Sequence, residues 1–160
     1  MKSGGIPFAA LPVEARRSLD WRDPLAVAAG LAGQDGALCL LSDPDQPGSR
    51  SFVATDPDAV RVLDRIDGPL FDSLRAAGLG RGVVGLAAYD AGARPATGER
   101  PSVWPDLILA RYPAMLVFDH EAMTVEAVGR GVDAPASEAA CRQAVAWLAD
   151  AVEPETPHAP

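Results

Sequence analysis

The chain of 160 residues is predicted to be an α+β domain with a mostly antiparallel sheet and about three helices. Five or six short runs, apolar or alternating, have the length of strands, and turn-forming residues punctuate them, among fifteen glycines and fifteen prolines. Three further segments carry the start or stop signals of helices. The length suits one domain, and we divide it into an irregular segment 1–20, a domain over 21–152 and a linker or disordered tail over 153–160.

In the first half of the chain, a helix and a pair of strands are expected. Asp23 can cap a helix whose first turn holds Pro24, where the missing N–H costs nothing. The apolar run 37–41 and the segment 50–54 are predicted to be strands joined by a turn-rich loop. Two further segments follow in order: a short strand or helical turn over 57–66 and a helix over 69–77.

In the second half, three strands are expected. Residues 82–89 are small and apolar, as in a strand buried on both faces, and a proline-rich loop should follow over 92–105. The longest apolar run, 107–118, contains Pro113, which indicates an edge strand or a bulge because proline cannot donate to a central ladder. Residues 123–128 alternate and would pair back with this run as a hairpin.

A last helix is expected to begin at Ser137, which would be its cap. Its apolar stripe has 4-3-4 spacing and comprises Cys141, Val145, Leu148 and Val152. Cys39 also lies in an apolar run, so both cysteines are expected to be buried thiols in a reducing cytosol.

The charge distribution argues against a nucleic-acid partner. The net charge is −8, and no basic cluster is present that could hold a phosphate backbone. No apolar stretch approaches the roughly 20 residues that a membrane helix needs, and the first residues do not resemble a secretion signal. A cytoplasmic protein is therefore expected.

The residues by themselves indicate no catalytic or metal site. Gly80, Gly82 and Gly85 match G-x-G-x-x-G, but the motif leads into a predicted strand, so we interpret it as close backbone approach rather than a nucleotide site. His120 lies beside Asp119 in a predicted turn, and a catalytic dyad would need a nucleophile that the sequence does not locate. Two distant cysteines and two distant histidines lack the spacing of metal ligands.

An ordered series of short motifs does indicate a family. In chain order they are Trp21-Arg22-Asp23-Pro24, Leu40-Leu41-Ser42, Arg50-Ser51-Phe52 with Asp56-Pro57, Gly82-Val83-Val84-Gly85-Leu86 with Tyr89-Asp90-x-Gly92, and Pro105-Asp106-Leu107, Tyr112 and Phe118-Asp119-His120. This series resembles the N-terminal domain of component I of the chorismate-using amidotransferase systems. These systems are aminodeoxychorismate synthase, in p-aminobenzoate and folate synthesis, and anthranilate synthase, in tryptophan synthesis.

The resemblance implies half of a layered component I architecture, completed by a C-terminal chorismate-binding domain. That domain would hold Mg²⁺ and chorismate and is not in these 160 residues, so we expect no cofactor in this chain and no activity of the chain alone. The implied partners are the chorismate-binding domain, in cis or in trans, and a glutamine amidotransferase subunit. Uncovered apolar strand faces would also favour a homodimer.

The resemblance further implies a pocket of the kind that binds L-tryptophan. By motif position, Ser42 would meet the polar end of the ligand, and Arg50, Ser51 and Phe52 would line the neighbouring wall. The family often has an acidic or polar residue where this chain has Leu41. That departure, and the compact strand ending in Phe-Asp-His, favour the aminodeoxychorismate branch; the alternatives are the anthranilate synthase domain and a stand-alone tryptophan-binding sensor.

Overall fold

The computed structural model describes residues 13–77, 80–98, 103–149 and 151, and their strands form two antiparallel sheets. The five-stranded sheet has the order β1-β8-β7-β3-β2. Its strands are β1 (Val13–Leu19), β2 (Leu38–Leu40), β3 (Arg50–Ala54), β7 (Ala114–Asp119) and β8 (Thr124–Gly131). The three-stranded sheet has the order β4-β6-β5 and contains β4 (Ala59–Leu63), β5 (Val83–Ala87) and β6 (Leu107–Arg111). The predicted α+β class with antiparallel pairing is confirmed.

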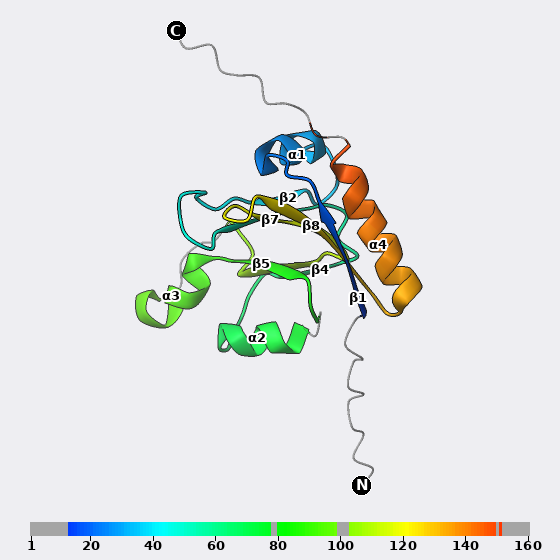
Figure 1. Ribbon diagram of the computed structural model, residues 1–160. Coiled ribbons are helices and arrows are strands. Elements are labelled where there is room, and N and C mark those ends of the chain that lie inside the picture. Colours follow the sequence, from blue (N-terminus) through cyan, green and yellow to red (C-terminus); the bar gives the residue numbers. More distant parts are fainter. Residues whose placement is uncertain (1–12, 78–79, 99–102, 150, 152–160) are drawn as a thin grey trace.

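Four helices in the described residues lie around the two sheets (Figure 1). They are α1 (Pro24–Leu31), α2 (Leu70–Ala77), α3 (Tyr89–Thr97) and α4 (Ala134–Trp147). Helices α1 and α4 lie against the five-stranded sheet, α2 lies on the far side of the three-stranded sheet, and α3 lies beside the end of that sheet (Figure 1). None of them has the length and apolarity that a helix spanning a membrane requires.

The main core lies between the five-stranded sheet and α1 and α4. Leu116, Phe118 and Val125 of the central strands are fully buried there together with Val27 of α1. On β8, Gly129 allows α4 to lie directly on the sheet, because a Cβ at this position would overlap Ser137 O and Cys141 N. A smaller core under α2 contains Leu107, Leu109, Leu70 and Leu74.

Several of the predicted local structures are confirmed. The helix expected at Asp23 is α1, and the Asp23 carboxylate accepts a hydrogen bond of 2.7 Å from Leu25 N. The predicted strand pair is β2–β3, and the predicted hairpin is β7–β8. The segment 57–66, predicted to be either a short strand or a helical turn, contains β4, and the helix predicted over 69–77 is α2.

The prediction of an irregular segment over 1–20 is wrong for its second part, which forms β1. This strand pairs with β8 along its whole length, from Val13 opposite Gly131 to Leu19 opposite Val125. Only Ala15 of β1 is buried, and Arg16 forms ion pairs with Glu14 and Glu126. An edge strand of this kind needs few apolar residues, so its sequence carries little strand signal. Residues 1–12 and the tail 152–160 lie outside the described residues.

The apolar run 107–118 is not one edge strand but two central strands of different sheets. Its first part is β6, between β4 and β5, and its second part is β7, between β8 and β3. Pro113 lies at the junction, where its missing N–H interrupts neither ladder, and its carbonyl accepts a hydrogen bond of 2.7 Å from Arg130 N. The proline therefore marks the crossing from one sheet to the other.

Two predictions around β5 are also wrong. The strand is at an edge and is not buried on both faces, since the side chain of Leu86 is 59% exposed. The expected proline-rich loop begins with a helix, α3, because Arg94 on that helix pairs with the buried carboxylate of Asp106.

The cap of α4 and one cysteine differ from expectation as well. Asp133 caps the helix by accepting a hydrogen bond from Ala136 N, and Ser137 lies one turn later, where its hydroxyl donates to Ala134 O. Cys141 is buried as predicted, but Cys39 is exposed because β2 is a short edge strand. Val152, the last residue of the predicted stripe, lies outside the described residues.

Candidate functional site

Distant parts of the chain meet at one end of β3. The register of β3 and β7 places Ser51 opposite Phe118, which brings His120, in the turn after β7, next to Ser51. The Ser51 hydroxyl lies 2.7 Å from Nε2 of His120 and accepts a hydrogen bond of 3.1 Å from Ser42 N. We call Trp21, Ser42, Ser51 and His120 the serine–histidine cluster.

Trp21 encloses the cluster from the side of α1. Its ring lies 5.5 Å from the imidazole of His120 and 6.1 Å from the ring of Phe118, between centroids, and both pairs are edge-to-face. Such pairs contribute about 0.5–1.5 kcal/mol beyond the area that they bury. The aromatic contacts therefore hold the imidazole in one place against β3.

Ser51 places a hydroxyl next to His120, at the position where a catalytic dyad would need its nucleophile. Its proton is available to Nε2, since its oxygen accepts from Ser42 N. Ser51 is fully buried, however, and no described residue hydrogen-bonds Nδ1 of His120 to orient it as a base. Nucleophilic catalysis needs a reachable hydroxyl and an oriented base, so this pair is suited to positioning the surrounding chain.

Ser42 presents the polar surface of the cluster. Its hydroxyl donates a hydrogen bond of 2.6 Å to Arg50 O, so the oxygen keeps both lone pairs to accept hydrogen bonds. The side chains of Leu40 and Leu41 are 44% and 52% exposed. A hydroxyl acceptor next to apolar surface is suited to an ammonium group that carries an apolar side chain.

The four predicted ligand-binding residues do not all converge. Ser42 and Ser51 are in contact, but side chains alternate along β3, so those of Arg50 and Phe52 lie on the opposite face of the sheet from Ser51. The Arg50 guanidinium there pairs with Asp119 at 3.2 Å. The pKa of Asp119 is held below its ordinary value by hydrogen bonds, the largest from Ala122 N and a smaller one from Arg50.

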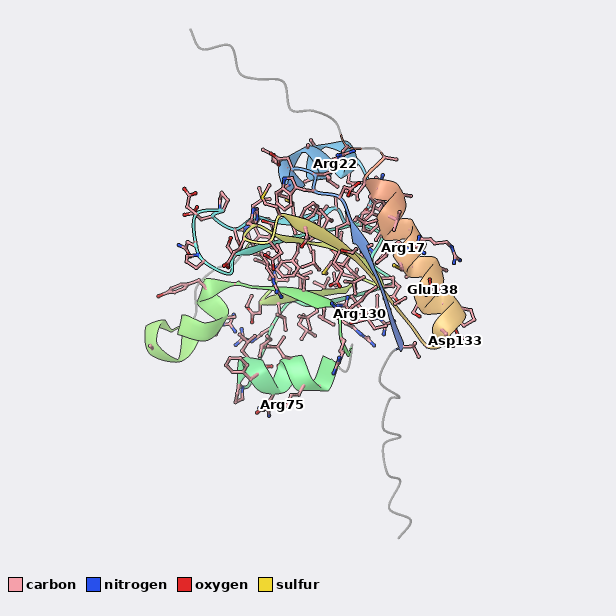
Figure 2. The ribbon with its side chains drawn as sticks, in the orientation of Figure 1. Arg17, Arg22, Arg75, Arg130, Asp133 and Glu138 are labelled. Atoms are coloured by element: carbon pink, nitrogen blue, oxygen red, sulfur yellow. The ribbon has the colours of Figure 1, made fainter. Side chains whose placement is uncertain are left out.

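Two buried polar atoms lack a hydrogen-bond partner among the described residues. One is Oγ of Ser49, whose carbonyl accepts a hydrogen bond from His120 N next to the cluster. The other is Nη1 of Arg130, whose Nε donates to Glu14 at 3.0 Å. Figure 2 shows Arg130 between β8 and the three-stranded sheet. Buried polar atoms of this kind usually bond to a water or a ligand.

A second cluster joins the remaining motifs around Asp106. Its carboxylate accepts two hydrogen bonds from Arg94, of 2.8 and 2.7 Å, and one of 2.7 Å from Ile66 N. Its carbonyl accepts from Ala88 N. Asp106 is fully buried, and the hydrogen bonds from Arg94 are the main reason that its pKa lies below the ordinary value. This cluster anchors α3 and the loop after β4, and no sequence pattern indicates that Arg94 would reach it.

Two of the three glycines of the motif, Gly82 and Gly85, show the close approach that the sequence predicts, whereas a Cβ at Gly80 would meet nothing within 4 Å. The motif leads into β5, and Gly82 has a φ of +74° with Tyr112 O only 2.8 Å from where a Cβ would stand. A Cβ at Gly85 would lie 2.7 Å from the side chain of Leu109. Both glycines are therefore explained by close approach to β6.

Among residues 13–77, 80–98 and 103–149, no three His, Cys, Asp or Glu side chains are grouped so that they could hold a metal ion. No protein-family model matches the chain, and no curated protein matches it either. The functional argument therefore depends on the two clusters and on the motifs that they bring together.

Proposed function

We propose that the chain is the N-terminal, non-catalytic domain of an aminodeoxychorismate synthase component I. The observation that supports this most is the composition of the serine–histidine cluster. Trp21, Ser42, Ser51 and His120 come from four separate motifs of the resemblance, and they contact one another in succession. Residues that resembled the family by chance would have no reason to meet at one place in the fold.

In this proposal the domain serves as scaffold and regulator. A chorismate-binding domain, in cis or in trans, holds chorismate and Mg²⁺, and a glutamine amidotransferase subunit supplies ammonia. The surface around Ser42 supports docking of such a domain, since Leu40 and Leu41 expose apolar side chains beside it. Contiguous exposed apolar surface is typical of a surface that another protein covers.

A growth experiment tests the proposal. A bacterium whose component I has lost its N-terminal domain should require p-aminobenzoate, and the 160-residue chain supplied in trans should restore growth without it. A parallel strain with the equivalent deletion in anthranilate synthase tests the tryptophan branch. Rescue of the first strain supports the proposal, rescue of the second strain alone supports the anthranilate alternative, and rescue of neither contradicts both.

The hydroxyl oxygen of Ser42, which can still accept hydrogen bonds, supports a second candidate, a site for L-tryptophan. The ligand's ammonium would donate to Ser42 Oγ, and its indole would lie on Leu40 and Leu41. Calorimetric titration with L-tryptophan tests this, with Ser42→Ala as the variant and Ser18→Ala, an exposed serine of β1, as the control. Saturable heat that Ser42→Ala removes, with a raised Tm of the unchanged chain, would favour a sensor; absence of heat would contradict it.

A further inference from the structure

The open edge of β5 is the least protected strand edge in the described part of the chain. Exposed edges carry unpaired backbone groups, and proteins shield them with charges, with proline or by keeping the strand short. Edge strand β1 carries Glu14, Arg16 and Arg17, edge strand β4 has Arg61 at its centre, and β2 has only three residues. The sequence of β5 is Val-Val-Gly-Leu-Ala, which contains none of these devices.

The hydrogen-bonding groups of β5 are divided between its two edges. Tyr112 N donates to Gly82 O and Ala88 N donates to Asp106 O, so the even-numbered residues of β5 face β6. The backbone groups of the odd-numbered residues therefore point outward. These residues are Val83, Gly85 and Ala87, and no described residue supplies them with a partner.

We propose that two copies of the chain pair through β5, antiparallel about a two-fold axis at Gly85, to form one six-stranded sheet. In this register Gly85 lies opposite Gly85 of the second copy, Val83 opposite Ala87, and Val84 opposite Leu86. The odd-numbered pairs exchange backbone hydrogen bonds, and Leu86, now 59% exposed, gains an apolar neighbour.

A second copy fits this edge because β5 is uncharged and can lie opposite itself without placing like charges together. The chain has a net charge of −8, so two copies repel each other in general, but β5 has no charge to place opposite itself. The same pairing through β4 would place Arg61 opposite Arg61, and like charges directly opposite destabilise a strand pair.

The first test is the mass of the full 160-residue chain by sedimentation equilibrium over a range of concentrations. The expected result is twice 16.6 kDa at high concentration. Ala87→Pro removes only an outward N–H on an edge strand. Because of the two-fold symmetry both copies lose this group, so the dissociation constant of the dimer should rise at least tenfold. Val62→Lys, on β4, is the matched control, since Val62 is 53% exposed at the opposite edge and should leave the dimer unchanged. A chain that is monomeric at all concentrations would overturn the proposal, and so would a dimer that Ala87→Pro leaves intact.

A cross-linking test of the register remains if Ala87→Pro fails to fold. Directly opposite residues of a non-hydrogen-bonded pair have Cα atoms about 4.5 Å apart, within the range of a disulfide. In a Cys39→Ser background, Val84→Cys chains mixed with Leu86→Cys chains should therefore form a covalent dimer on oxidation. Each variant oxidised alone should form at least tenfold less covalent dimer than the mixture. Equal amounts of covalent dimer in the single-variant samples would overturn the register.

Discussion

The hydroxyl of Ser51 and Nε2 of His120 lie 2.7 Å apart although 69 residues separate them in the chain. The pairing of β3 with β7 creates this contact, because Ser51 lies opposite Phe118 and the chain turns at His120. Ser42 joins through its backbone N–H and Trp21 through its ring. The cluster therefore depends on the sheet, and its residues should behave as a unit.

Ser51→Ala should lower the free energy of unfolding by about 1–3 kcal/mol. The change leaves the Ser42 N–H and the imidazole of His120 without their partner, and unpaired buried polar groups cost about this much. Urea denaturation followed by tryptophan fluorescence measures the effect. Ser42→Ala removes one hydroxyl at an exposed residue and should cost less than about 1 kcal/mol; equal losses would mean that Ser51 does not organise the cluster.

Asp106→Asn should lower the free energy of unfolding at pH 7 by about 3 kcal/mol or more, because it removes the carboxylate charge that pairs with the partly buried guanidinium of Arg94. The pKa of Asp106 is lower in the fold than in the unfolded chain, where it is about 4. The ion pair therefore stabilises fully above that pH, and its contribution disappears as the pH falls through the folded pKa.

Urea denaturation from pH 7 to pH 2 tests the dependence on pH. The difference in stability between the unchanged chain and Asp106→Asn should be constant near neutral pH and should shrink below about pH 4. A difference that stays constant down to pH 2 would show that ionisation of Asp106 contributes nothing to stability.

Gly129→Ala should be more destabilising than a typical change of this size, by about 3 kcal/mol or more, because the new Cβ overlaps the backbone of α4. Gly33→Ala is the control, since a Cβ there meets nothing within 4 Å and should change stability by less than about 0.5 kcal/mol. Thermal melts by circular dichroism would compare the two. Similar Tm values for both variants would contradict the close seating of α4 on β8.

Tyr112→Phe should lower the free energy of unfolding by about 1 kcal/mol. The hydroxyl of Tyr112 is buried and donates a hydrogen bond of 2.9 Å to Gly36 O, which fastens the loop after α1 to the junction of the two sheets. Tyr89→Phe is a matched control, because Tyr89 is 88% exposed. Urea denaturation should give a loss for the first variant and no change for the second, whereas a loss for Tyr89→Phe alone would contradict the assignment.

The fold could be predicted from the sequence where the signals are local. Asp23 with Pro24 indicated α1, and the alternation over 123–128 indicated the hairpin, because caps and alternation depend on neighbours in the chain. The edge strand β1 and the helix α3 could not be predicted in this way. The first is held by pairing with β8 and the second by Arg94 on Asp106, and neither contact has a local pattern.

The candidate site was predictable only in part. The motifs pointed to Ser42 and Ser51, which are in contact, but the alternation of side chains along β3 separates Arg50 and Phe52 from them. Trp21 stood out only as part of a motif, and His120 only as part of a motif and as a histidine without a located nucleophile. Their place beside Ser51 follows from the register of β3 with β7, which a single sequence does not specify.

Reconstitution of chorismate amination in vitro tests the central claim most directly. The purified 160-residue chain would be added to a chorismate-binding domain of an aminodeoxychorismate synthase component I, with chorismate, Mg²⁺ and ammonia, and the product would be separated by chromatography. We predict aminodeoxychorismate from the mixture and none from the chain alone. A mixture that forms no more product than the chorismate-binding domain by itself, although the two proteins are folded, would contradict the account.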